Sequence, residues 1–378
     1  MTMIAIPKET SDKETRVAMI PAIAKKLVHA GAEVVVESGL GAACGFADDE
    51  YREAGVRVSE DCKTLLAEAD IVLRIHRPTA EEVALLKQGA LHVSYLDPFN
   101  EKKTVAAFQK QQVTAISVEM IPRSTRAQKL DALSSQASLA GYVMVMQAAN
   151  RLNRILPMMM TPAGTIKPAR VFILGAGVAG LQAIATAKRL GARVTAFDTR
   201  AVVAEEVESL GAKFLKIDLG ETGQTVDGYA QELTPEQLET QKQAQAAEIA
   251  QSDVVITTAQ VFGRKPPVLV TRAVLSQMQP GSVVVDMAAE TGGNVEGSVA
   301  GQETVIDGVI VIGSGNWAGQ VSRDASAMYA SNLFNLIDEF WSEEKKQIEL
   351  DLEDDILSGC VITHAGSIVN ETIKNHYA

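Results

Sequence analysis

The stretch from Arg170 to Asp198 constrains the fold of this chain more than any other part of the sequence. It reads RVFILGAGVAGLQAIATAKRLGARVTAFD and opens with an unbroken apolar run, which is typical of a strand buried on both faces. Three glycines follow in G-x-G-x-x-G spacing, ahead of a segment whose apolar residues fit one face of a helix that stops at Gly191. A second strand, 193–197, ends on Asp198. This order of strand, glycine turn, helix, strand and acid predicts a dinucleotide-binding unit.

Each glycine of the turn has its own role in such a unit. Gly175 permits the tight turn, Gly177 has no side chain to keep a pyrophosphate off the backbone, and Gly180 lets the helix pack close to the strand. The helix N-terminus adds free N–H groups and a positive dipole end. Asp198 can accept hydrogen bonds from both hydroxyls of an adenosine ribose and would repel a 2′-phosphate. The pattern therefore favours NAD over NADP, although Arg200 could meet a phosphate.

Composition restricts the ligands and the compartment. The formal net charge of -12 argues against nucleic acid or an anionic membrane as a direct ligand. Cys44, Cys62 and Cys360 show no C-x-x-C spacing and no nearby histidine cluster, so we expect reduced thiols and no metal site. We expect no signal peptide, because the chain opens directly with a strand, and the longest uncharged run, 132–150, is too polar to span a membrane. A cytoplasmic protein is expected.

The rest of the chain alternates between predicted strands and helices. Before the glycine turn, strands are expected at 3–6, 34–36, 71–75, 91–95 and 114–118, and helices at 21–30, 48–54, 81–87 and 101–111. After it, strands are expected at 213–217, 254–258, 282–286 and 309–312, and helices at 202–210 and 235–250. Such alternation predicts an α/β fold of two Rossmann-like, doubly wound parallel-sheet domains with an NAD cleft between them.

Two long helices set the expected domain boundaries. One, 134–156, connects the halves, and the other, 324–341, is expected to cross back to the first. We therefore predict an N-terminal domain of residues 1–133 plus 324–378 and an NAD-binding domain of residues 134–323. The methionine run 158–160 is expected to be flexible core filling between the domains.

A dense group of polar side chains lies between the last strand of the first half and the connecting helix. Arg123, Gln128, Asp131 and Ser134 all fall within RSTRAQKLDALSS. This segment is either part of a ligand site or a solvated loop in which Ser134 caps the next helix.

The chain resembles the NAD(H)-binding component, domain I, of proton-translocating NAD(P) transhydrogenase. The resemblance is carried by IPKE…ETRVA, PRSTRAQKLDALSSQASLAGY, PMMMTPAGTIKPARVFILGAGVAGLQAIATAKRLGA, FDTR, DGYA, VVITTA and PGSVVVDMA, which together span essentially the whole chain. The loop PR-x-x-RAQ-x-x-DALSS is the most specific of these stretches. In that family this loop holds the nicotinamide of NAD(H).

The resemblance implies a role for individual residues. Contacts to the nicotinamide, its amide or its ribose are expected from Arg123, Gln128, Asp131 and Ser134. Val178 should lie under the pyrophosphate, whereas Asp198, Thr199 and Arg200 should hold the adenosine ribose side. Gly228 and Tyr229 should belong to a mobile loop that folds over the nucleotide.

Two stretches depart from the family pattern. Gln260, Val261 and Phe262 stand where the family usually has an ALIPGKPAP-like loop, which puts adenine contacts there in doubt. The turn 314–320 replaces one that contains more proline, and Trp317 is expected to alter the surface offered to a partner.

The related alanine dehydrogenases are an alternative interpretation, because they share IPKE…RVA and the glycine turn. That family has a lysine at the position of His76 and a histidine at that of Asp97, and both are missing here. Arg16 is common to both families and decides nothing. His76 is expected to be a strand-end residue rather than a base, since the sequence places no acid beside it.

A catalytically idle NAD-binding regulatory module is a third interpretation, against which the complete nicotinamide loop argues.

The implied reaction is direct hydride exchange between NADH and NADP⁺, which needs no general acid, general base or metal. The protein has to hold two C4 atoms about 3–3.5 Å apart and exclude water. The resemblance implies that NADP(H) is held by a partner component and that a membrane-spanning partner conducts protons. A homodimer docked at the cytoplasmic face of that partner is expected, with a hairpin exchanged from the glycine-rich segment 218–229.

Overall fold

The structure, a computed structural model, describes residues 1–218, 234–260 and 263–378. Its contacts divide the chain into two units, residues 1–136 with 318–378, and residues 137–317. The boundaries predicted from the sequence differ from this division by three residues at the first crossing and six at the second. Helix α6 (Ala132–Arg151) begins in the first unit and continues in the second.

The first unit is built on an eight-stranded sheet with strand order β19-β18-β6-β5-β4-β1-β2-β3. Its strands are β1 (Met3–Ile6), β2 (Glu33–Glu37), β3 (Arg57–Ser59), β4 (Ile71–His76), β5 (Leu91–Tyr95), β6 (Thr114–Ser117), β18 (Val361–His364) and β19 (Ser367–Ile368). Strands β1 to β6 are mutually parallel, as predicted, whereas β18 and β19 add an antiparallel edge. The C-terminal segment thus completes the sheet that the N-terminal segment begins.

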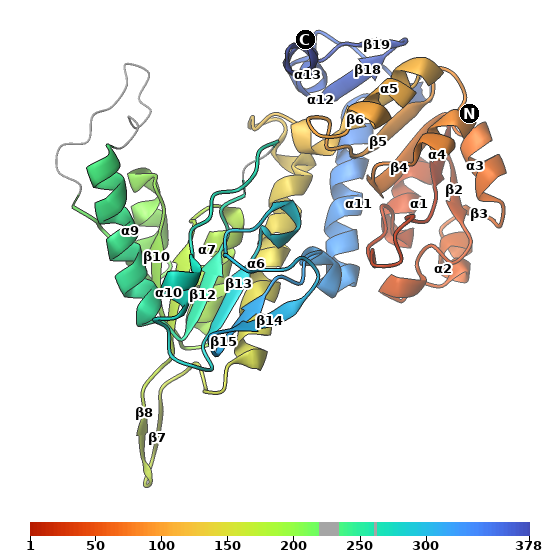
Figure 1. Cartoon of the computed structure of the whole chain (residues 1–378). Coiled ribbons are helices and arrows are strands. Elements are labelled where there is room, and N and C mark those ends of the chain that lie inside the picture. Colours follow the sequence, from red (N-terminus) through yellow and green to blue (C-terminus); the bar gives the residue numbers. More distant parts are fainter. Residues whose placement is uncertain (219–233, 261–262) are drawn as a thin grey trace. The chain divides into compact units, whose positions relative to one another are not determined.

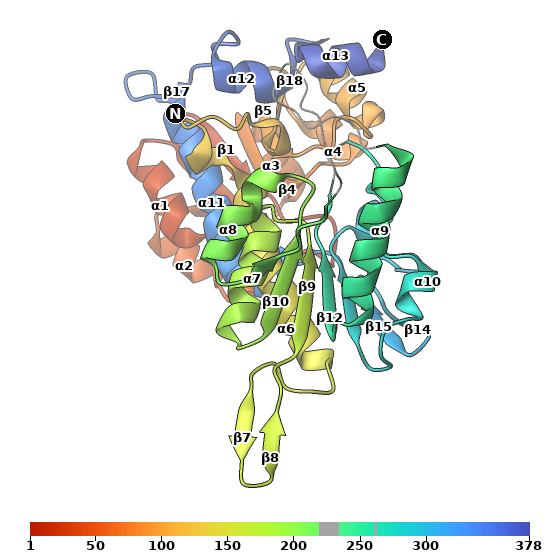
Figure 2. The same ribbon diagram turned by 90° about the vertical axis from the view of Figure 1, so that its left-hand side faces the viewer.

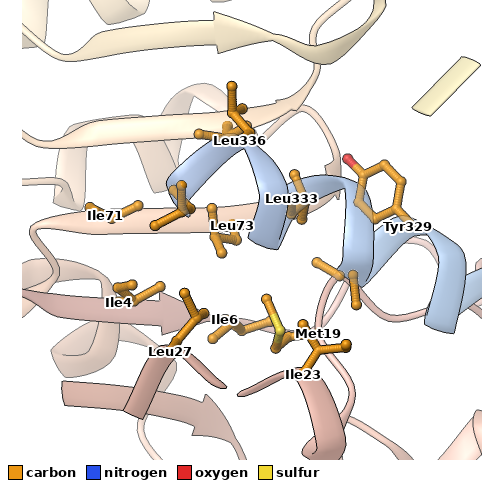
Figure 3. Close-up of a cluster of buried hydrophobic side chains, with 14 of the residues drawn as sticks. Ile4, Ile6, Met19, Ile23, Leu27, Ile71, Leu73, Tyr329, Leu333 and Leu336 are labelled. Atoms are coloured by element: carbon orange, nitrogen blue, oxygen red, sulfur yellow. The ribbon is translucent and has the colours of Figure 1, made fainter. Parts of the chain in front are cut away.

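Helix α11 (Ser322–Glu339) belongs to the core of this unit. Its Leu333 and Leu336 pack with Leu73 of β4 and Ile6 of β1, as Figure 3 shows. Leu333 and Leu336 are both buried and lie three residues apart on the helix, which places them on one face. The remaining helices are α1 (Pro21–His29), α2 (Asp48–Glu53), α3 (Cys62–Glu68), α4 (Ala80–Leu85), α5 (Lys102–Gln111), α12 (Asp355–Cys360) and α13 (Glu371–Tyr377).

The second unit contains a seven-stranded sheet with strand order β11-β10-β9-β12-β13-β15-β14. The strands are β9 (Arg170–Leu174), β10 (Arg193–Phe197), β11 (Lys213–Phe214), β12 (Val254–Thr257), β13 (Val283–Asp286), β14 (Glu303–Ile306) and β15 (Val309–Ile312). All pairs are parallel except β14 with β15. The order reverses at β9, where parallel sheets of this kind bind ligands beyond the carboxyl ends of the strands.

Helices pack against this sheet as Figure 2 shows. Helix α7 (Val178–Arg189) contacts β9 and β10, and α8 (Ala204–Ser209) contacts β11. Helix α9 (Pro235–Ala250) contacts the short α10 (Arg272–Leu275). The predicted Rossmann-like α/β class is confirmed.

The methionine run does not fill a core, so that expectation is wrong. Strands β7 (Met159–Thr161) and β8 (Gly164–Ile166) form a separate two-stranded hairpin, which extends away from the sheet of its unit in Figure 1. Met158, Met159 and Met160 are 61, 45 and 72 % exposed. The turn residues Pro162 and Ala163 reverse the chain within this short apolar stretch, which the apolar composition alone did not reveal.

Membrane-spanning helices, metal-ligand clusters and the state of the cysteines complete the description of the fold. No helix in residues 1–218, 234–260 and 263–378 has both the length and the apolar character needed to cross a membrane. Within the same ranges, no three histidine, cysteine or acidic residues gather as a metal site would require. Cys44 and Cys360 are buried, Cys62 is half-buried, and all three are free thiols.

Candidate functional site

The turn after β9 requires glycine at its first position. Gly175 has φ of 103°, and a Cβ there would lie 2.4 Å from Oγ1 of Thr258. Thr258, which follows β12, donates its hydroxyl to the carbonyls of Leu174 and Gly175 at 3.1 and 3.2 Å. The turn is therefore fixed by the residue that follows the neighbouring strand, and the Thr258 hydroxyl lies too close for any side chain at Gly175.

Gly180 brings the first turn of α7 against the same backbone. A Cβ at Gly180 would lie 1.9 Å from the carbonyl oxygen of Gly175, a distance that no relaxation of a side chain could relieve. Gly141 of α6 approaches α7 equally closely, since its Cβ would lie 2.2 Å from the carbonyl oxygen of Ala179. These two glycines fix where the N-terminus of α7 points.

Gly177 differs from its neighbours because the described fold does not need a glycine there. Its φ of −80° and ψ of −169° are extended backbone that any residue adopts, and a Cβ would meet nothing within 4 Å. Gly177 is the N-cap of α7, where no side chain caps the helix, and the following Val178 is 44 % exposed. The space beside this helix N-terminus is open, and a pyrophosphate could reach the backbone there.

Asp198 lies one strand away from the glycine turn, directly after β10. Its Oδ2 accepts a hydrogen bond from the Ala176 backbone N–H at 2.8 Å, so the carboxylate is tied to the turn itself. Its Oδ1 accepts from the backbone N–H of Arg200 at 2.8 Å. Partial burial alone would raise the pKa of this carboxyl, but the hydrogen bonds from Arg200 and Ala176 hold it below its ordinary value. The group is therefore a carboxylate at neutral pH, as an acceptor of ribose hydroxyls must be.

The other residues expected on the adenosine side or in the loop over the nucleotide are placed only partly. Thr199 and Arg200 are exposed beside Asp198. Gly228 and Tyr229 lie outside the described residues, as do Val261 and Phe262.

The polar loop of the first unit is held by the start of α6. Asp131 accepts hydrogen bonds from the Ser134 backbone N–H at 2.8 Å and the Ser134 hydroxyl at 2.6 Å. Asp131 therefore caps α6, and the alternative in which Ser134 is the cap is wrong, because the helix begins two residues earlier than predicted. Arg123 and Gln128 are exposed on the same loop.

The anchors of this loop could not be recognised in the sequence. Arg126 binds three carboxylates, with its Nε 2.9 Å from Glu339 Oε1 and its Nη1 2.7 Å from both Asp354 Oδ2 and Asp355 Oδ1. The Lys129 carbonyl accepts from the side-chain amide of Asn332 at 3.0 Å. All four partners are more than 200 residues further along the chain, so no local pattern could predict them.

Arg16 and His76 meet at one buried carboxylate. Glu14 receives Nε and Nη2 of Arg16 at 2.8 and 2.7 Å and lies 2.6 Å from Nε2 of His76. The expectation that no acid lies beside His76 is therefore wrong, since the fold joins residues 62 positions apart. The remaining Nη1 of Arg16 donates to Gln136 at 2.9 Å. The guanidinium is thus engaged by the protein's own groups rather than open to a substrate carboxylate.

The two atypical stretches have local structural roles. Trp317 is 5 % exposed and its indole N–H donates to the Met287 carbonyl at 3.2 Å, so the expectation that it alters a partner-facing surface is wrong. Because the surrounding turn is polar, its sequence suggested a surface residue, whereas the large indole ring fills a buried position. The Gln260 side chain also approaches the Met287 carbonyl, at 3.4 Å.

Comparisons with known proteins agree with this fold. The family model for the N-terminal domain of alanine dehydrogenase/PNT matches residues 5–140, and that for the C-terminal domain matches residues 144–371. A Rhodospirillum rubrum protein that is named as a polypeptide of NAD(P) transhydrogenase subunit alpha is 44% identical over 99% of this chain and 100% of its own length. A crystal structure of transhydrogenase from Sinorhizobium meliloti, 42% identical, has a TM-score of 0.87 and covers 97% of this chain and 100% of its own. An L-alanine dehydrogenase structure, 26% identical, has a TM-score of 0.81 and covers 100% and 99% of the two chains.

Proposed function

The chain belongs to the alanine dehydrogenase/PNT family, and from that membership we propose that it is the NAD(H)-binding component of a proton-translocating NAD(P) transhydrogenase. In this proposal the chain delivers hydride from NADH to NADP⁺ held on a partner component, and a membrane partner couples the reaction to proton movement. The observation that carries the nucleotide half of the proposal is Gly177, which stands at an open helix N-terminus. The fold itself does not require a residue without a side chain at this position. A ligand that packs against the backbone explains that glycine.

The residues of the second unit fit the adenosine and pyrophosphate half of NAD(H). Gly175, Gly177 and Val178 would receive the pyrophosphate at the start of α7, where N–H groups favour anions. Asp198, tied to the turn through Ala176, would accept hydrogen bonds from the ribose hydroxyls. A carboxylate at this place repels a 2′-phosphate and so favours NAD(H) over NADP(H).

The loop of the first unit would orient the nicotinamide. Arg123 and Gln128 offer exposed donors, and Asp131 and Ser134 form a hydrogen-bonded pair at the start of α6. When bound, NADH supplies a hydride from its nicotinamide ring. The protein side chains then have to set the direction of that ring and keep water away, and no group has to move a proton.

An amino-acid oxidoreductase like alanine dehydrogenase is the alternative, supported by the likeness to the L-alanine dehydrogenase structure. The contacts of Arg16 and His76 count against it. Deamination needs a free cation for the substrate carboxylate and a group that moves protons, whereas Glu14 engages both side chains.

Reconstitution tests the proposal. The purified chain is mixed with an NADP(H)-binding component of a transhydrogenase, and transfer from NADH to an NADP⁺ analogue is followed by absorbance. We expect transfer in the mixture and none at a comparable rate with the chain alone. A parallel assay with alanine and NAD⁺ should show no NADH formation. Full-rate exchange by the chain alone would contradict the need for a partner, and alanine-dependent NADH would support the alternative.

A further inference from the structure

The carboxylate of Asp198 is already fully hydrogen-bonded by the protein. Besides the two backbone N–H groups, the Arg200 side chain donates from Nε to Oδ1 and from Nη2 to Oδ2, both at 3.0 Å. A carboxylate has about four lone-pair positions, two on each oxygen. Backbone groups fill two of them and the forked guanidinium fills the other two. A ribose that uses Asp198 must therefore displace a protein donor.

The displaced donor can be identified from the burial of the two side chains. The Asp198 side chain is 9 % exposed and fixed by backbone bonds to the turn, whereas that of Arg200 is 57 % exposed. The guanidinium can turn into solvent, while the carboxylate and the backbone N–H groups cannot leave. The 2′- and 3′-hydroxyls of a ribose are also two donors, so they match the two positions that Arg200 vacates.

We propose that the guanidinium of Arg200 competes with NAD(H) for Asp198, and that Arg200 thereby sets both nucleotide affinity and the discrimination against NADPH. The inference rests on the proposed NAD(H) site and changes the role expected for Arg200 from ribose ligand to competitor. Once displaced, the guanidinium lies beside the 2′ position. There it forms charge-assisted hydrogen bonds with a 2′-phosphate and offsets some of the repulsion from Asp198.

Opposite effects on two nucleotides are the expected signature. Because the arginine of this ion pair is exposed, the pair contributes little, and Arg200→Ala should bind NADH roughly two- to five-fold more tightly than the parent chain. The same variant should bind NADPH more weakly, because the favourable contact with a 2′-phosphate has gone. Arg200→Lys, which keeps the charge and loses the fork, should lie between the parent and Arg200→Ala for both nucleotides.

Fluorescence titrations of the full chain with NADH, NADPH and reduced nicotinamide mononucleotide test the inference. The mononucleotide lacks the adenosine ribose, so its affinity should not change in Arg200→Ala. Arg272→Ala, which removes another exposed arginine from an ion pair, with Asp307, is the matched control and should leave all three affinities unchanged. At about 1 M salt, where the screening length is about 3 Å, Arg200→Ala and the parent should bind NADH with equal affinity.

Each outcome of these titrations has one meaning. NADH binding by Arg200→Ala that is equal to or weaker than that of the parent overturns the competition. An NADPH affinity that rises in parallel with that for NADH overturns the effect on discrimination. Failure of the folded parent to bind NADH contradicts the proposed function itself, and the inference falls with it.

Discussion

A substitution at Gly177 can distinguish what the fold requires at this position from what ligand binding requires. Because a Cβ at this position meets nothing within 4 Å and the backbone is extended, Gly177→Ala should change the free energy of unfolding by less than about 0.5 kcal/mol. Its methyl group would occupy the space of a bound pyrophosphate, so NADH affinity should fall at least about tenfold. Thermal unfolding and NADH titration on the same sample measure both quantities.

Gly180 is the matched control for that prediction. Its Cβ would lie 1.9 Å from a carbonyl oxygen, so Gly180→Ala should lose stability as well as binding. If Gly177→Ala bound NADH as the parent does, the open space would not be the pyrophosphate site.

Gln128 should act on geometry more than on affinity. It is exposed, and each hydrogen bond it makes to a nicotinamide contributes only about 1 kcal/mol. A displacement of the ring by about 1 Å can nevertheless cost roughly 100-fold in rate. Gln128→Ala and Asp131→Asn should therefore keep NADH binding within a few-fold while hydride transfer to the partner falls much further; asparagine still caps α6. Stopped-flow transfer rates and titrations decide this, and equal losses of rate and affinity would show that the loop only binds.

Glu14 should make stability depend on pH. Burial would raise its pKa, but the hydrogen bonds from Arg16 and His76 lower it well below the ordinary 4.5. A lowered carboxyl pKa stabilises the fold above the unfolded-state value, and this contribution is lost as pH falls below about 4.5. Glu14→Gln should thus lose about 3 kcal/mol at pH 7, because Arg16 stays buried without its counter-charge, and the difference from the parent should shrink on acidification. Urea unfolding at pH 7 and pH 4 measures it, and a constant difference would count against the ion pair.

At the scale of elements, periodicity predicted most helices and parallel strands, because a single face or a continuous apolar run is visible locally. Helix α9 was predicted with its observed bounds, Pro235–Ala250, and the structure shows that the Thr234 side chain caps its N-terminus. The β7–β8 hairpin and the antiparallel strands β18 and β19 were missed, since they are short and their pairing depends on distant partners. The glycine turn and Asp198 could be recognised because their pattern lies within one short stretch of sequence. The bond from the Arg200 side chain to Asp198 emerged only from the structure.

The loop at 123–131 and the start of α12 should loosen together when Arg126 is removed. Its guanidinium joins them through Asp354 and Asp355, and also reaches Glu339 of α11. Because Arg126 and Asp355 are exposed, we expect Arg126→Ala to raise amide hydrogen exchange in both segments with little change in melting temperature. Arg52→Ala, which removes an exposed pair within α2, should leave exchange in the loop unchanged. Unaltered exchange in Arg126→Ala would mean that the contacts of Lys129 with Asn332, Asn335 and Glu339 hold the loop without Arg126.

At the scale of the whole molecule, we expect a homodimer. Residues 219–229 of the segment expected to exchange, 218–229, lie outside the described residues. The β7–β8 hairpin offers exposed methionines, and an isolated two-stranded hairpin is only marginally stable. Met160→Lys should weaken association, and Met328→Lys, an exposed methionine on α11, should not. Light scattering at decreasing concentration measures the mass. A 40.3 kDa species for the parent at all concentrations would contradict the prediction.

The route of the chain through its two sheets has a consequence for biosynthesis. The second unit, 137–317, is continuous, and the ribosome completes it before the first unit has all its segments. Until α11 emerges, Ile6 and Leu73 lack the leucines that cover them, and β6 has no β18 beside it. The nascent first unit therefore presents an apolar sheet face and an open strand edge during much of synthesis. A chaperone that shields such surfaces during translation would protect this chain most between the appearance of β6 and that of β18.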